Sequence, residues 1–318
     1  MKIGTLGTSF ITESLIEAFL EAGNEVNAIH SRSIEKAEKL KEKYHAKKAY
    51  DDYDAMLKDE DVDTIYVGLP NALHYEYTKK ALLNNKNVVL EKPFTATYEE
   101  ALELRELAVQ RHIYLFEAIL TIHQPAVIQM KEDIKKLGAL HLASFNFSKY
   151  SSKYDEFLSG KNPNIFNPEM AGGALMDMNI YNIHLSQYLF GKPLKYYYVA
   201  NDEKGIDTSG VAILKYDNFI ANLITAKDSV SKSGGIIMGE KGCITFDEAT
   251  SIISKYTITY KDNTVEVHDF KGNNRYVNEI NAMKKIVEND DYDKHLELLD
   301  YSLEVMKTLC EVKTNTIK

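Results

Sequence analysis

The chain has 318 residues, 44% of them hydrophobic and 27% charged, with a formal net charge of −9 at pH 7. This composition is ordinary for a globular protein, and the length predicts two domains. The acidic balance argues against a nucleic-acid-binding protein, because phosphate contacts need clustered Lys and Arg, which are here interleaved with Asp and Glu.

Residues 1–120 alternate short apolar runs with segments of helical periodicity. We expect strands at residues 2–8, 25–30, 63–69, 86–90 and 114–118, and helices at residues 11–22, 33–44, 73–84 and 97–112. This alternation predicts βαβ units in a doubly wound parallel sheet. The ligand site of such a domain lies at the carboxyl ends of the strands.

Residues 121–318 show a different pattern, in which strands follow one another directly. We expect a loop at 151–173, helices at 126–136, 174–190, 275–288 and 292–307, and strands at 140–149, 194–201, 210–216, 219–225, 235–239, 243–246, 251–260 and 264–269. Strands arriving in a run predict an α+β domain with a largely antiparallel sheet and helices on one face. The fold class is therefore α/β with two domains, 1–120 and 121–318.

A glycine turn links the first strand to the first helix. Gly7-Thr8-Ser9-Phe10-Ile11-Thr12 resembles the G-x-G-x-x-G dinucleotide fingerprint, with Ser9 and Thr12 in place of its later glycines. The start of the helix favours an anion such as pyrophosphate. The alternative is a plain strand–turn–helix junction.

The second strand ends in His30-Ser31-Arg32-Ser33. NAD-binding domains usually carry Asp or Glu here for the ribose 2′-hydroxyl, but a hydroxyl and a guanidinium suit a 2′-phosphate. The alternative is a helix cap beside a solvent-facing arginine.

Two further motifs carry groups able to move protons. Glu91-Lys92-Pro93 follows a strand, and a lysine held beside a nicotinamide can act near neutral pH, although an ordinary surface lysine would look the same. In the helix after Gly172-Gly173, Asp177, Tyr181 and His184 are spaced i, i+4 and i+7 and so share one face. The alternative there is a structural polar face.

Nothing in the sequence indicates export or a metal. Neither Cys243 nor Cys310 stands at zinc-ligand spacing from another Cys or His, so no zinc site or disulfide framework is expected. The N-terminus lacks a signal-peptide pattern, and no run approaches the ~18 apolar residues of a membrane span. We therefore expect a cytoplasmic protein without membrane or nucleic-acid partners.

These motifs in this order resemble the glucose–fructose oxidoreductase/inositol dehydrogenase/MocA family, and the resemblance spans nearly the whole chain. Glu91-Lys92-Pro93 and Gly172–His184 are its most specific parts. Pro70-Asn71-Ala72-Leu73-His74 and the passage from Glu117-Ala118 to His123 and Pro125 also match. Ala171 and Asn179 replace two signature glycines, and Thr121-Ile122 replaces an aromatic–arginine pair.

The resemblance implies a Rossmann domain followed by a substrate domain whose open sheet forms an oligomer interface, in a homodimer or homotetramer. It implies hydride transfer between NADP(H) or NAD(H) and a sugar, polyol or dihydrodiol, with NADP(H) preferred because of Ser31 and Arg32. It makes Lys92, Asp177 and His184 the catalytic residues, with His184 or Lys92 handling the proton. The expected cofactor-binding residues are Gly7, Thr8, Ser9, Phe10, Ile11, Ser31, Arg32, Pro70, Asn71, His74, Glu91, Lys92 and Pro93.

Two other functions remain open from the sequence. A cofactor-binding regulatory protein without turnover would keep the fold and lose the chemistry. A structural or partner-binding protein would need Lys92, Asp177 and His184 to be scattered in the fold. The sequence does not identify the substrate, although we expect Lys149, Lys153 and Tyr154 to lie near it.

Overall fold

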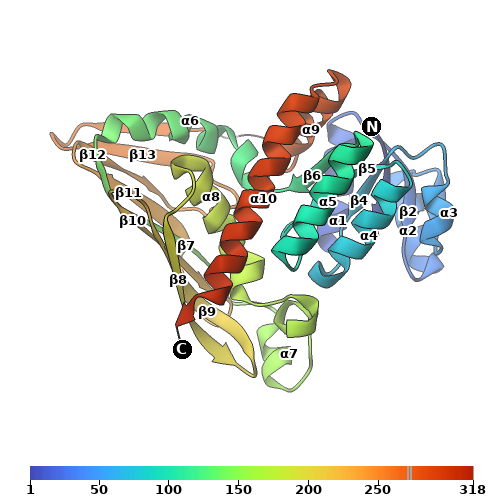
Figure 1. The fold of residues 1–318 in the computed structure, drawn as a ribbon, viewed down its shortest axis with the longest axis horizontal. Helices are drawn as coiled ribbons and strands as arrows, with labels where there is room; N and C mark the ends of the chain where they lie inside the picture. The colour runs from blue at the N-terminus through green and yellow to red at the C-terminus, as the bar shows by residue number, and fades with distance from the viewer. Residues whose placement is uncertain (271, 273, 318) are drawn as a thin grey trace. The chain divides into compact units, whose positions relative to one another are not determined.

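The computed structural model describes residues 1–270, 272 and 274–317 and divides into two compact units (Figure 1). The first comprises Met1–Ala118 with Tyr276–Leu303, and the second comprises Ile119–Arg275 with Glu304–Lys318. The first unit thus includes Tyr276–Leu303, which the expected domain boundary after residue 120 assigns to the second domain.

The first unit is built on a six-stranded parallel sheet in the order β3-β2-β1-β4-β5-β6. This confirms the doubly wound fold, and β1 is the strand at which the order reverses. The strands are β1 (Lys2–Leu6), β2 (Glu25–His30), β3 (Lys48–Tyr50), β4 (Thr64–Val67), β5 (Asn87–Glu91) and β6 (Leu115–Ala118).

Helices flank this sheet, with α4 packed on α5 and α1 packed on α9. They are α1 (Phe10–Glu21), α2 (Ile34–Tyr44), α3 (Tyr53–Leu57), α4 (His74–Leu83), α5 (Tyr98–Arg111), α9 (Val277–Glu288) and α10 (Tyr292–Thr314), the last of which also runs into the second unit. A capping box starts α5, since the Thr97 side chain accepts a hydrogen bond from the Glu100 amide and the Glu100 side chain accepts one from the Thr97 amide.

The second unit is built on a nine-stranded sheet in the order β14-β13-β12-β11-β7-β10-β9-β8-β15, and most of its neighbouring pairs are antiparallel. This confirms the expected largely antiparallel sheet. Its strands are β7 (Leu140–Ser148), β8 (Lys195–Glu203), β9 (Ile206–Lys215), β10 (Ile220–Ala226), β11 (Gly234–Gly239), β12 (Gly242–Phe246), β13 (Lys255–Tyr260), β14 (Val265–Asp269) and β15 (Thr316–Ile317).

Helices α6 (Pro125–Asp133) and α8 (Ile180–Phe190) pack on each other, and α8 also contacts β7 and β10. Alternate strand residues such as Phe145, Leu214 and Leu223 are fully buried in the core. The segment 151–173, expected as a loop, contains the short helix α7 (Tyr154–Leu158) and two 3₁₀ turns, Asn164–Phe166 and Pro168–Met170.

No helix in the described part of the chain combines the length and the apolar character needed to cross a bilayer. Among the same residues, no group of three His, Cys, Asp or Glu side chains is arranged to hold a metal ion. Cys243 and Cys310 are not joined by a disulfide bond.

Candidate active site

Most of the predicted cofactor-binding residues follow the carboxyl ends of the strands in the first unit. Gly7 follows β1, Ser31 and Arg32 follow β2, Pro70 follows β4, and Lys92 follows β5. Because all six strands are parallel, these residues lie along one edge of the sheet. The predicted edge is therefore assembled within a single unit.

The turn after β1 fits a phosphate group. Gly7 has φ +105°, and a Cβ atom there would lie 2.6 Å from the carbonyl oxygen of Gly68, so only glycine fits. Ser9 caps α1 by accepting from the Thr12 amide. The first-turn amides of Phe10 and Ile11 have no intrahelical acceptor, as at any helix start, and both residues are exposed.

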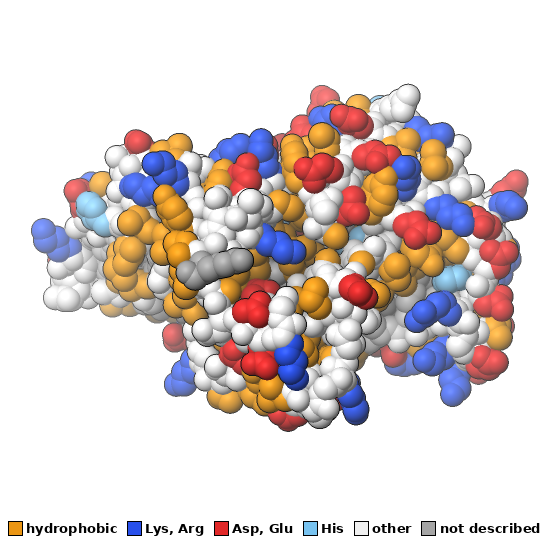
Figure 2. Space-filling model, turned by 60° about the horizontal axis from the view of Figure 1, so that its bottom comes forward, with side chains coloured by type: hydrophobic (Ala, Val, Ile, Leu, Met, Phe, Trp, Pro, Cys, Tyr) orange, Lys and Arg blue, Asp and Glu red, His pale blue; other side chains and the backbone are white. Residues whose placement is uncertain are grey.

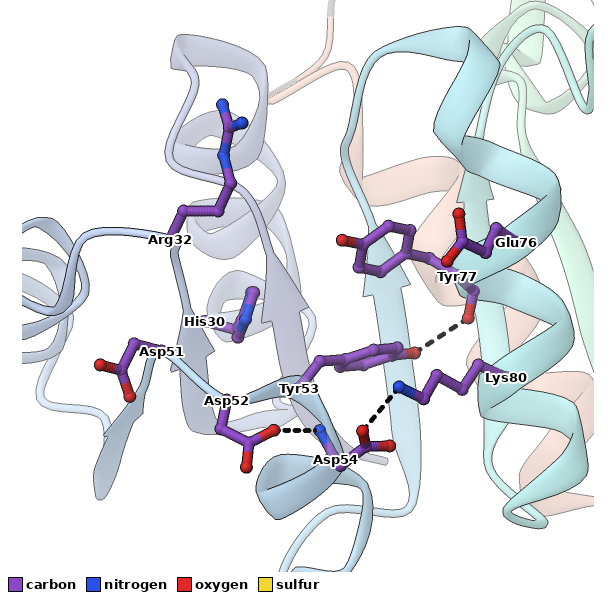
Figure 3. A pocket seen from close by; sticks show the side chains of 9 residues that line it. All are labelled: His30, Arg32, Asp51, Asp52, Tyr53, Asp54, Glu76, Tyr77 and Lys80. Carbon is purple, nitrogen blue, oxygen red and sulfur yellow. Dashed lines mark hydrogen bonds and ion pairs between the residues drawn. The ribbon is translucent and has the colours of Figure 1, made fainter.

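The turn after β2 opens on a cavity of about 310 Å³ (Figure 3). Arg32 is exposed at its rim, whereas Ser31 is buried and accepts a hydrogen bond from the Ser33 amide at 3.3 Å. Ser31 therefore shapes the turn, and Arg32 is the residue of this pair available to a ligand. The cavity is lined by His30, Arg32, Asp51, Asp52, Tyr53, Asp54, Glu76, Tyr77 and Lys80.

Aromatic rings form one wall of this cavity. The ring centroids of His30 and Tyr53 are 5.8 Å apart, and those of Tyr53 and Tyr77 are 5.3 Å apart. Lys80 pairs with Asp54 at 2.7 Å, which partly offsets the carboxylates of the lining (Figure 3). Flat rings beside a guanidinium suit a nucleobase and a phosphate on its ribose.

His74 does not reach an open pocket, because it is fully buried. Its Nδ1 lies 2.9 Å from the carbonyl oxygen of Pro93, and its Nε2 lies 2.9 Å from that of Leu69. Burial lowers the pKa of His74, and the two carbonyl contacts oppose this effect. His74 is expected to bind the cofactor, but its geometry favours a structural role, in which it ties the loop after β4 to the loop that carries Lys92.

Lys92 and the neighbouring Glu91 are both half-buried, and the Lys92–Pro93 peptide bond is cis. The neighbouring Glu91 accepts a hydrogen bond from the Tyr66 hydroxyl at 2.8 Å. Burial raises the pKa of Glu91 to about 7, although the positive charge of Lys92 and the Tyr66 hydrogen bond oppose this shift. Lys92 thus lies next to a carboxyl group that titrates near neutral pH.

In the second unit, a glycine pair leads into the helix that carries the other candidates. Gly173 has φ +108°, and a Cβ atom there would lie 2.0 Å from Oδ1 of Asp207. Asp207 also accepts hydrogen bonds from the Leu175 amide and the Tyr198 hydroxyl, both at 2.7 Å. The glycine therefore lets the chain pass close to a buried carboxylate that holds the start of the helix.

The expected helix 174–190 begins with a π-helical turn, Leu175–Asn179, before α8. Such turns are rare and often occur at functional sites. Asp177 and Tyr181 are partly exposed, whereas His184 is completely buried. Of the three residues, only Asp177 and Tyr181 are therefore open to solvent, and the catalytic role expected for the buried His184 stays a prediction.

Asn179, which stands where the family signature has glycine, adds polar contacts. Its backbone is right-handed helical at φ −69°, so no unusual angle demands a special residue. Its side-chain amide donates to the carbonyl oxygen of Leu223 at 3.1 Å and accepts from Asn182 at 2.8 Å. These buried hydrogen bonds fasten the π-helical turn to β10.

Sequence reasoning missed Lys227, whose ammonium forms an ion pair with Asp177. The two residues are 50 positions apart. The local pattern at the end of β10 gives no signal for this contact, because a lysine after a strand is usually exposed.

Comparison with known proteins agrees with this architecture. Residues 1–118 match the model of an oxidoreductase family with an NAD-binding Rossmann fold, and residues 128–245 match a GFO/IDH/MocA C-terminal domain. A scyllo-inositol 2-dehydrogenase (NADP(+)) of Bacillus subtilis is 33% identical over 270 residues, covering 84% of this chain and 81% of the relative. A trans-1,2-dihydrobenzene-1,2-diol dehydrogenase of Homo sapiens is 27% identical over 250 residues, covering 77% and 72%.

Among solved structures, a 3-ketoreductase from Actinomadura kijaniata in complex with NADP and TDP-benzene has a TM-score of 0.89. The match covers 99% of this chain and 97% of the ketoreductase at 23% identity, which shows the fold. Together with the two family matches, it confirms the resemblance carried by Glu91-Lys92-Pro93 and Gly172–His184. The chain therefore belongs to the GFO/IDH/MocA family of oxidoreductases, which have an NAD-binding Rossmann domain.

Proposed function

We propose that this protein transfers a hydride between NADP(H) and a sugar, polyol or dihydrodiol, and that it accepts NAD(H) less well. The observation that carries the proposal is the edge of the parallel sheet, which the glycine turn after β1, Arg32 after β2 and Lys92 after β5 all share. The related inositol and dihydrodiol dehydrogenases support a hydroxylated substrate.

When bound, the nicotinamide cofactor supplies or accepts the hydride. Lys92 accepts or donates the proton of the reacting hydroxyl group. Asp177 accepts a hydrogen bond from a substrate hydroxyl. Tyr181 is a better candidate than the buried His184 to contact the substrate, because its side chain is partly exposed.

The preference for NADP(H) rests on Arg32. Its exposed guanidinium can pair with a 2′-phosphate, and no Asp or Glu takes the position that would accept a ribose hydroxyl in NAD-binding domains. Asp51 and Asp52 also line the cavity, so Arg32 must offset their charge before it can favour an added phosphate.

A parallel fluorescence titration with NADPH and NADH tests the cofactor assignment. We expect several-fold tighter binding of NADPH, and Arg32→Ala should remove that difference. Arg111→Ala is the matched control, because Arg111 is also exposed but ends α5 and bonds to Leu83 and Asn85. An unchanged NADPH affinity in Arg32→Ala would refute the role of Arg32.

Turnover is then measured with panels of polyols, sugars and dihydrodiols. Lys92→Ala should still bind NADPH measurably and lose turnover, whereas replacing Lys79, a partly exposed lysine on α4 paired with Glu103, by alanine should keep wild-type binding and turnover. If the wild type binds NADPH but turns over none of these classes, a cofactor-binding regulatory protein becomes the better interpretation.

We also propose that the protein forms a cytoplasmic homo-oligomer through the sheet of the second unit. Leu142 lies beside Ile220 and Met238 on adjacent strands, and Tyr197 lies beside Ile213. Figure 2 shows hydrophobic side chains among polar ones over this unit, in the left part of the view. Sedimentation at micromolar concentration should reveal a dimer or tetramer that Tyr197→Lys weakens, and a wild-type monomer would refute the proposal.

A further inference from the structure

We propose that Lys227 is a positioning residue that keeps Asp177 ionised and directed toward the substrate, so that Asp177 accepts a substrate hydrogen bond and does not carry the proton. This inference rests on the proposed oxidoreductase function and assigns a role to a lysine outside the four motifs of the sequence. Three observations support it: the burial of Lys227, its ion pair with Asp177 and contact with Phe166, and its position directly after strand β10.

Lys227 is fixed at both backbone groups. It follows directly on β10, which lies between β7 and β9 inside the sheet. Its amide donates to the carbonyl oxygen of Thr208, and its carbonyl oxygen accepts from the Ser151 amide, both at 2.8 Å. The side chain therefore starts from a rigid point.

The ammonium of Lys227 is held inside the unit. Its side chain is 1% exposed, whereas that of Asp177 is 30% exposed, so the lysine approaches the carboxylate from the protein side. The Lys227 Nζ also lies 5.1 Å from the ring centroid of Phe166, a cation–π contact with a fully buried ring. Lys227 thus holds Oδ2 of Asp177 and leaves the carboxylate partly open to solvent.

A buried ion pair is weak evidence for stability, because desolvation of the two charges can exceed their attraction. Replacing such a pair by hydrophobic residues of similar volume is often neutral or stabilising. The charge of Lys227 is therefore better explained by what it does to Asp177. An ammonium in contact with a carboxylate favours its ionised form and fixes its direction.

Other ionisable groups approach the same π-helical turn, and they must be separated from Asp177 in any pH measurement. Of the elements packed against the turn, β9 brings Asp207, β7 leads into Lys149, and α8 brings Tyr181 and His184. Asp207 is occupied by the Leu175 amide and the Tyr198 hydroxyl, and burial raises its pKa. An Asp177→Asn variant identifies which part of the pH profile of kcat/KM is due to Asp177.

The first experiment is the pH profile of kcat/KM for the wild type, Lys227→Met, Lys227→Arg and Asp177→Asn. In Lys227→Met the acid limb should move upward by about 1–3 pH units, because Asp177 loses its neighbouring positive charge. Lys227→Arg should keep the wild-type limb, and Asp177→Asn should lose the component that Lys227→Met displaces, whereas a limb near pH 7 that all variants share belongs to Glu91. Lys192→Met is the matched control, because Lys192 pairs with Glu304 at 2.8 Å near the surface.

The second experiment does not need turnover. Melting temperatures are measured from pH 5 to 8 for both single variants and for Lys227→Met/Asp177→Asn. Asp177→Asn should be the least stable variant, because it leaves a buried ammonium without its counterion, and the double variant should recover. The difference in melting temperature between Lys227→Met and the double variant should change with pH, because Asp177 titrates in the first variant and is absent from the second.

These readouts separate the two proposals. If the wild type binds no NADPH or turns over no substrate, the proposed function fails while the melting-temperature cycle still tests the pair. If Lys227→Met is folded, binds NADPH and keeps the wild-type acid limb, the positioning role is overturned. Additive melting-temperature changes in the cycle would overturn the coupling itself.

Discussion

The imidazole of His74 joins two loops, with its Nδ1 2.9 Å from the carbonyl oxygen of Pro93. Its Nε2 makes the corresponding contact with Leu69, and the ring is fully buried. Pro93 follows Lys92, so the position of Lys92 depends on a histidine that does not face the solvent. His74 therefore belongs to the site as a structural element.

Replacing His74 with alanine should lower the free energy of unfolding by about 2–4 kcal/mol, since it leaves a cavity and removes the imidazole N–H that one of the two carbonyl groups accepts. It should also reduce turnover by displacing Lys92. Denaturant unfolding and a kcat measurement check the two effects. His45→Asn is the matched control, because His45 is exposed and its left-handed backbone, at φ 55°, suits asparagine. Equal stability of the two variants would contradict this role.

The carboxyl group of Glu91 should make stability depend on pH in the neutral range. Its pKa is about 7 in the folded chain and near 4.5 in the unfolded chain, so the folded state binds more protons between these values. The free energy of unfolding should therefore fall as the pH rises from about 4.5 to about 7. Glu91→Gln should flatten this part of the stability profile, as measured by urea unfolding at several pH values.

The hydroxyl group of Tyr66 provides an internal control for Glu91. It donates to the Glu91 carboxylate and so stabilises the ionised form. Tyr66→Phe should extend the decline in stability to higher pH, whereas in the presence of Glu91→Gln it should have no effect on the slope. A slope that survives Glu91→Gln would assign the titration to another group.

A second pH effect should come from His295 on α10. Its Nε2 accepts a hydrogen bond from the Leu115 amide at 2.9 Å, and burial lowers its pKa from 6.5 to about 4. The unfolded chain binds the extra proton first, so the stability that is present above pH 6.5 should be lost as the pH falls toward 4. Melting temperatures of His295→Gln should lose this acid dependence.

The exposed His112, which stacks on Tyr292, is the control for this measurement. His112→Asn keeps a residue that tolerates its left-handed backbone and should retain most of the wild-type acid slope, because burial outweighs the charge of His112 in lowering the pKa of His295. If both variants retain the slope, His295 is not the group that titrates.

The first-unit elements were predicted well because strands and helices of ordinary length carry a clear hydrophobic period. The strand Lys48–Tyr50 and the helix Tyr53–Leu57 were missed because three and five residues are too few to show one. The π-helical turn Leu175–Asn179 was also missed, since its hydrogen-bond pattern leaves no mark on residue spacing.

Some residues of the candidate site could likewise be placed from the sequence, and others could not. Arg32 and Lys92 could be predicted because they follow strands, and strand ends define the edge of a parallel sheet. Lys227 could not be predicted, because its contact with Asp177 depends on how β10 meets a turn 50 residues earlier. The burial of His184 depends on the same tertiary packing, which a helical spacing does not reveal.

The strongest steric prediction concerns Gly173, which precedes the π-helical turn. Its φ of +108° strains any residue with a Cβ atom, and that atom would also lie 2.0 Å from Oδ1 of Asp207. Gly173→Ala should therefore displace Asp207 from the Leu175 amide and lower the free energy of unfolding by more than about 2 kcal/mol. Because Asp177 lies in the turn that follows, turnover should fall as well.

A Gly160→Ala variant separates the two causes of this loss of stability, which are backbone strain and the collision with Asp207. It has φ +91°, but a Cβ atom added there would meet no heavy atom within 4 Å, so Gly160→Ala should show the backbone strain alone. The difference between the two variants in urea unfolding then measures the collision with Asp207. If Gly173→Ala is no less stable than Gly160→Ala, the close approach to Asp207 does not explain why glycine stands before this helix.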